Sequence, residues 1–134
     1  MLTSALDGIR LSLHILAATI WVGGQFTLAG LVPSLRNAGA GVTTIAARAF
    51  AKISWPAYAI LILTGLWNVA AVNMSQTTTA WKIVLGVKLV VVGFSGLAAY
   101  LHTKAKTPAQ NGIWGSISGT MAAASLILGV FLAG

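Results

Sequence analysis

The chain lacks cysteine and has almost no acidic side chains. Its 134 residues include no cysteine, and Asp7 is the single acidic residue. Without thiols there are no disulfides and no thiolate-bound metals. With one carboxylate, the chain lacks the side chains that soluble enzymes commonly use as general acids and bases. Charged residues make up 7% of the chain, against roughly 25% in soluble domains. A water-facing surface cannot be built from so few.

Apolar residues take the place of the missing charges. They make up 57% of the sequence and are gathered in four runs of about 20 residues or more, enough for a helix to cross the roughly 30 Å hydrocarbon core of a bilayer. Short connections make neighbouring helices antiparallel. The sequence therefore predicts an all-α, integral membrane, up-and-down four-helix bundle. It forms a single transmembrane domain over residues 1–134, with helices at about 9–35, 50–73, 81–104 and 112–134.

The basic residues predict the orientation of these helices. The net charge is +7, but the eight basic residues stand singly between apolar runs, which indicates control of topology and no nucleic-acid partner. The first and third loops have the larger share of them, which places these loops in the cytoplasm and both termini outside a bacterial-type cytoplasmic membrane. The residues on the cytoplasmic side are Arg36, Arg48, Lys52, Lys104 and Lys106, against Arg10 and Lys82 on the outer side.

Small residues on the helices predict close packing. Gly115 and Gly119 form a GxxxG pair, a pattern that lets helix backbones approach each other in a bilayer. Besides the lipid bilayer, the expected partners are a second copy of the chain in a homo-oligomer, a redox partner, or a larger membrane complex.

The stretch LHILAATIWVGGQF, residues 13–26, holds the first candidate site residue. On a regular helix His14, Ala18, Trp21 and Gln25 fall on one face, which predicts that the polar and aromatic side chains point together into the bundle. An ionisable residue inside a membrane span is by default a functional-site hypothesis. The alternative is a histidine that bonds a neighbouring carbonyl and fixes helix packing.

Lys88 is the expected partner of His14. It follows Trp81 by seven residues, about 10 Å along the axis, and His14 lies about 6 Å past Arg10, so both are expected at similar depth in the outer half. The second predicted helix ends on that side with Trp67 and Asn68, and these residues outline a pocket there. The alternative for Lys88 is snorkelling of its amine to the interface.

The second histidine, His102, is expected at the cytoplasmic end of the third helix. It lies about 20 Å from Lys88 at the helical rise, so it cannot share a metal with His14 in this topology. We interpret it as an interfacial histidine beside Lys104, with a second cofactor site near the cytoplasm as the alternative.

The chemistry of these residues favours haem or copper. Neutral imidazole is a good ligand for haem iron and for copper. Trp21 and Trp67 offer flat apolar walls for a porphyrin, and the Lys88 amine suits a propionate. Copper would find a thioether at Met74, at the outer end of the second predicted helix, which makes His14 with Met74 an alternative metal site.

The sequence also resembles a known superfamily. The run from His14 through Trp21, Gly23 and Gly24 to Pro33, LHILAATIWVGGQFTLAGLVP, is similar to the first helix of copper-resistance protein D (CopD) domains. Lys88 in WKIVLGVKLVVVGF resembles the third-helix lysine of the same group. HemJ-type protoporphyrinogen oxidases look like relatives, and in them a first-helix histidine and a third-helix lysine form the functional pair, with b-type haem as cofactor.

The resemblance implies His14 as the haem or metal ligand and Lys88 as its companion. Two departures stand out. CopD proteins are generally larger, and the third helix ends here in SGLAAYLHTKAK, less aromatic and basic than in HemJ proteins. The expected function is haem b binding with HemJ-like porphyrinogen oxidation or membrane electron transfer. The alternatives are CopD-like copper uptake and a structural accessory subunit.

Overall fold

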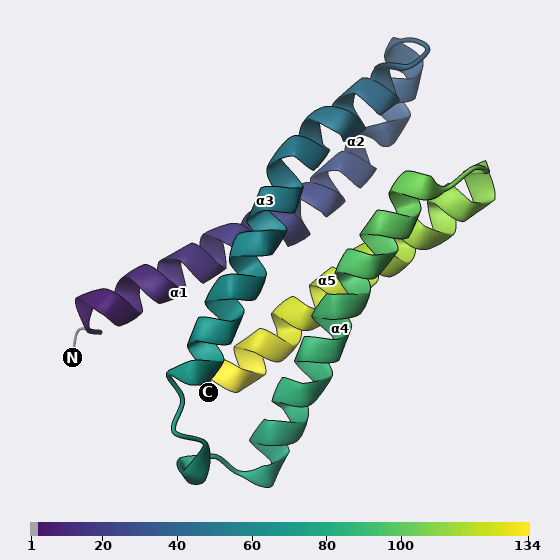
Figure 1. The fold of residues 1–134 in the computed structure, drawn as a ribbon. Helices are drawn as coiled ribbons and strands as arrows, with labels where there is room; N and C mark the ends of the chain where they lie inside the picture. The colour runs from purple at the N-terminus through teal and green to yellow at the C-terminus, as the bar shows by residue number, and fades with distance from the viewer. Residues whose placement is uncertain (1–2) are drawn as a thin grey trace. The chain divides into compact units, whose positions relative to one another are not determined.

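Helices with short connections make up residues 3–134, the part of the chain described by the computed structural model. No strand occurs in that range. Four helices within it are long and apolar enough to cross a membrane, as predicted from the apolar runs. The chain divides into two compact units, Met1–Val72 and Asn73–Gly134, and each contains a pair of long helices (Figure 1).

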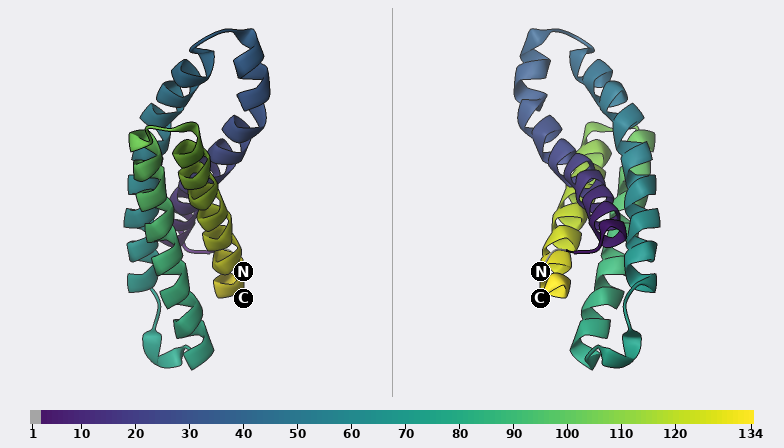
Figure 2. Two further views of the ribbon diagram at one scale, coloured as in Figure 1. Left: turned by 90° about the vertical axis from the view of Figure 1, so that its right-hand side faces the viewer. Right: turned by 90° about the vertical axis from the view of Figure 1, so that its left-hand side faces the viewer.

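The first unit is a helical hairpin. Its first arm consists of α1 (Ala5–Ala18), a π-helical segment η1 (Thr19–Gly23) and α2 (Gly24–Ala38), which follow one another without a break. Its second arm is α3 (Val42–Ala70), which returns antiparallel and contacts all three segments of the first arm (Figure 2). The hairpin therefore places the second half of α1 against the second half of α3.

The turn of this hairpin is shorter than predicted. It depends on Gly39 (φ 147°) and Gly41 (φ 80°), in a backbone region that residues with a Cβ rarely adopt. The helix predicted from about residue 50 begins at Val42. The intervening VTTIAARAFAK is rich in alanine, a strong helix former, and its charged Arg48 and Lys52 are exposed on the helix surface, so they do not require a loop.

The second unit is also a helical hairpin. A short 3₁₀ turn, η2 (Met74–Gln76), precedes α4 (Thr79–Lys104), and α5 (Pro108–Ala133) returns along it. Threonine caps both long helices: the Thr78 hydroxyl accepts from the Trp81 N–H, and the Thr107 hydroxyl accepts from the Gln110 N–H. Such caps satisfy backbone donors that the first helical turn leaves without partners.

Two serines join α4 to α5. The Ser95 hydroxyl donates to the Ser118 carbonyl and the Ser118 hydroxyl donates to the Ser95 carbonyl, each at 2.9 Å. Both serines are buried, as are Ala98 and Ala122. Small side chains allow the two backbones to come close enough for these bonds.

Candidate functional site around His14

His14 bonds across the hairpin of the first unit. It lies in α1, and its ring atom Nδ1 is 2.8 Å from Oγ1 of Thr64 in α3. The Thr64 hydroxyl is also 2.7 Å from the carbonyl oxygen of Ile60, one turn earlier in the same helix, and 3.3 Å from that of Leu61. Thr64 is buried, and His14 is half-buried.

These contacts indicate that His14 has its proton on Nδ1. A hydroxyl has a single hydrogen, and carbonyl oxygens only accept, so the Thr64 hydrogen is directed to the helix carbonyls. Thr64 must therefore accept from His14 Nδ1–H. A neutral imidazole protonated on Nδ1 has its lone pair on Nε2. A hydrogen bond at one ring nitrogen that fixes the tautomer and ring orientation is the usual arrangement around a metal-binding histidine.

Gly65 gives the imidazole its place against α3. A Cβ at this position would lie 3.4 Å from Cε1 of His14, at the edge of ordinary contact. The ring thus packs on the helix at Gly65 while it bonds Thr64 next to it. This contact joins α1 to α3.

Trp21 belongs to an aromatic cluster in the same hairpin. Its side chain is 2% exposed. Its ring centroid lies 4.4 Å from that of Tyr58 and 5.6 Å from that of Trp55, with both rings tilted. Tilted pairs at such distances are favourable. The chain's own rings therefore surround Trp21, and its role as a porphyrin wall stays a prediction.

Gln25 satisfies a backbone group beside the π-helical segment. Its side-chain amide donates to the Trp21 carbonyl at 3.0 Å. A π-helical turn accommodates one extra residue in a helix, so residues before and after η1 do not follow a single α-helical face. The face predicted from regular spacing, which runs from His14 through Ala18 and Trp21 to Gln25, is interrupted at this point. Gln25 as a cofactor contact stays a prediction.

Trp67 and Asn68 lie one turn after Thr64 on α3. Trp67 is 38% exposed, so part of its indole is open to a ligand or to lipid. Asn68 differs, because its Oδ1 atom is buried and has no hydrogen-bond partner. Since buried polar atoms are normally paired, Asn68 stands out as a polar residue near His14 that is able to accept a hydrogen bond.

The other predicted site residues lie in the second unit. The Lys88 amine packs against Gly129 of α5, where a Cβ would lie 2.7 Å from Nζ. His102 Nδ1 donates to the Asn111 carbonyl at 2.8 Å, and Met74 lies in η2. The pairing of His14 in the first unit with Lys88 or Met74 in the second unit therefore remains a prediction.

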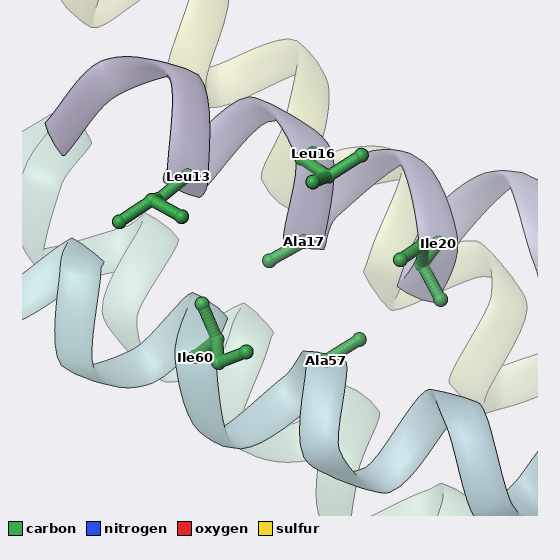
Figure 3. Close-up of a pocket in the computed structure, with 6 residues that line it drawn as sticks. All are labelled: Leu13, Leu16, Ala17, Ile20, Ala57 and Ile60. Atoms are coloured by element: carbon green, nitrogen blue, oxygen red, sulfur yellow. The ribbon is translucent and has the colours of Figure 1, made fainter. Parts of the chain in front are cut away.

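A small apolar cavity lies between α1 and α3 (Figure 3). Its volume is about 60 Å³, far below the roughly 300–1,000 Å³ of pockets that hold organic ligands. A haem bound to this hairpin would therefore lie on its surface. The lining residues are Leu13, Leu16, Ala17, Ile20, Ala57 and Ile60.

The donor set near His14 suits a cofactor that needs few protein ligands. Within residues 3–134, no group of three or more His, Cys, Asp or Glu side chains could hold a metal ion. A bare metal ion would need further donors of another kind, whereas haem supplies four nitrogens of its own and takes only axial ligands from the protein.

The structure adds residues that the sequence interpretation missed. Thr64 and Gly65 form the immediate surroundings of His14, and Tyr58 completes the aromatic cluster around Trp21. A hydroxyl followed by a glycine inside the apolar run LILTGLW was the available signal, because small and hydroxylated residues favour helix contacts in membranes.

Comparisons with known proteins give this chain no relative: no protein-family model, no curated protein and no solved structure matches it. The resemblance to CopD and HemJ proteins therefore stays a prediction.

Proposed function

We propose that this chain is an integral membrane protein whose four long helices cross the bilayer and assemble into one bundle. Large apolar side chains on both hairpins support this proposal, because water would disfavour their exposure. Ile15 is 64% exposed, Leu63 67% and Phe131 73%. Lipid or a second copy of the chain would cover such surfaces.

Within that bundle we infer that His14 would bind the iron of haem b. The observation that supports this role is the hydrogen bond from Nδ1 to Thr64, whose own hydrogen is directed to the Ile60 carbonyl. It leaves the lone pair on Nε2, the form of histidine that binds iron. Thr64 orients the ring, and Gly65 lets it approach α3.

The surrounding residues would bind and shield the cofactor. Trp67 supplies apolar surface next to the Thr64–Gly65 pair, and Lys88 is proposed as the companion cation for a propionate. When bound, haem b supplies one-electron redox chemistry, and the protein contributes ligation, orientation and exclusion of water. The activity implied by the resemblance is porphyrinogen oxidation, or electron transfer to a membrane acceptor.

The test is the visible spectrum and metal content of the full chain, purified in detergent from cells grown with iron and copper. We expect a Soret band and about one haem per chain. His14→Ala should lose the band while the helical circular-dichroism signal persists. His102→Ala is the matched control, because its Nδ1 also donates to an oxygen acceptor, and it should keep the band.

Other outcomes would contradict the assignment. If the band is lost in His102→Ala and kept in His14→Ala, the ligand is His102. Stoichiometric copper without a Soret band would favour CopD-like copper uptake through His14 and Met74. Neither metal nor haem would favour an accessory subunit of a larger membrane complex. Unfolding of His14→Ala alone would make His14 a packing residue.

A further inference from the structure

The start of α1 has an arginine whose hydrogen bonding is incomplete. The Arg10 side chain is 11% exposed, and its Nη2 atom lies 2.8 Å from the Asp7 carboxylate. Its Nε atom is buried and has no hydrogen-bond partner. An N–H donor of a charged guanidinium is costly to bury without an acceptor, so the Nε–H group is a candidate donor to a ligand.

A second incomplete group lies at the same level of the hairpin. Arg10 is four residues before His14 on α1, and Asn68 is four residues after Thr64 on α3. The two helices are antiparallel, and His14 bonds Thr64. Because Arg10 and Asn68 are each displaced by one turn, about 6 Å, in the same direction from the His14–Thr64 bond, they lie at a similar height along the hairpin. Each lies on the same helix face as the residue that forms this bond. Asn68 Oδ1 is also buried and unpartnered.

The chain itself has no second carboxylate side chain for Arg10. Asp7 is its single acidic residue, and Asp7 contacts Nη2. Guanidinium matches the geometry of a carboxylate. Asn68 lies opposite with an amide that accepts through Oδ1 and, after a half-turn of its last torsion, donates through NH₂. Arg10 and Asn68, each one helical turn from the His14–Thr64 bond, thus offer hydrogen-bond donors to a carboxyl group of a ligand.

We propose that Arg10, with Asn68 opposite, binds a carboxyl side chain of the porphyrin ligated by His14. This inference rests on the proposed haem function and extends it, because it assigns the ligand class as a carboxylate-bearing porphyrin. It also gives the ligand a direction, with one carboxyl group toward the start of α1. Lys88 lies in the other unit and is not needed for this contact.

Two ligands that differ only in their carboxyl groups test the proposal. The full chain in an uncharged detergent is titrated with iron protoporphyrin IX and with its dimethyl ester, and Kd is taken from the Soret band. We expect the wild-type chain to bind the free acid roughly 10- to 100-fold more tightly, the range of a charge-assisted hydrogen bond. Arg10→Met should markedly reduce this difference by weakening the acid alone.

Three further variants make the result specific. Arg36→Met removes an arginine from the other end of the hairpin and should keep the full difference. Arg10→Lys retains the positive charge but lacks the planar guanidinium, so it should keep part of the difference in Kd between acid and ester. This variant also tests the proposal if Arg10→Met does not fold. His14→Ala should weaken acid and ester equally, because both bind through iron.

The inference is overturned if wild-type protein binds acid and ester equally, or if Arg10→Met leaves the difference between acid and ester unchanged. In either case the haem function stands, since both ligands still bind. If the wild-type chain binds neither ligand, the haem function fails and the carboxylate site fails with it.

Discussion

Ser95 and Ser118 exchange two hydrogen bonds of 2.9 Å between α4 and α5, each hydroxyl donating to the carbonyl of the other residue. Reciprocal bonds of this kind require the two backbones to lie close together, which only small side chains permit.

The first prediction concerns this contact. Ser118→Leu should destabilise the protein by about 1–3 kcal/mol, because the added carbons have no room between α4 and α5. Ser116→Leu, two residues earlier on the exposed surface of the same helix, should change stability little. Denaturant unfolding in detergent, followed by circular dichroism, measures both. Equal stability of the two variants would show that this contact is not tight.

A second prediction compares two adjacent glycines. A Cβ at Gly24 would overlap the ring of Phe50 in α3, whereas a Cβ at Gly23 would meet nothing within 4 Å. Gly24→Ala should therefore cost about 1–3 kcal/mol through overpacking. Gly23→Ala should be neutral or slightly stabilising, since alanine favours helix. The two variants have the same composition, and their unfolding midpoints provide the comparison. Equal unfolding midpoints for the two variants would show that the Phe50 ring can move aside to accept the added methyl group.

A third prediction tests the orientation of His14. Thr64→Val keeps the shape of the side chain and removes the oxygen that accepts from Nδ1. Loss of such an outer contact typically lowers the affinity for a bound metal or its activity by about 10–100-fold, so haem titration should show a loss in this range. Thr64→Ser retains the hydroxyl and should lose much less. Equal affinity in all three proteins would exclude Thr64 as the orienting group.

The fourth prediction addresses Lys88. Its amine lies where the side chain of Gly129→Ala would enter, so that variant should move the flexible end of Lys88 at little cost in stability. If the amine acts on the haem, Gly129→Ala and Lys88→Met both shift the Soret maximum. Gly93→Ala, where a Cβ has open space, should leave it unchanged. An unshifted spectrum in Lys88→Met would instead support snorkelling.

The four long apolar helices were predictable from the sequence because length and composition determine whether a segment can cross a bilayer. The start of α3 was not, because the segment with Arg48 was interpreted as a loop and instead belongs to the helix, with Arg48 on its exposed surface. Charge alone does not end a helix where alanine favours its continuation.

The candidate site was predictable only in part. His14 stands out as an ionisable residue in an apolar run, but Thr64 does not, because a threonine in a helix can bond its own preceding carbonyl. Which side chain of α3 meets His14 depends on the rotation of one helix against the other. Spacing along a single helix contains no information on that rotation, and the π-helical turn changes it again.

That turn has a consequence for how the first arm can change. Adding or removing one residue rotates everything beyond it by about 100°. Deletion of one residue from Thr19–Gly23 would rotate α1, which contains His14, relative to α2, which contains Gly24. No other residue of the hairpin would be changed. The number of residues in the π-helical segment thus sets the rotation of α1 relative to α2 about the axis of the arm.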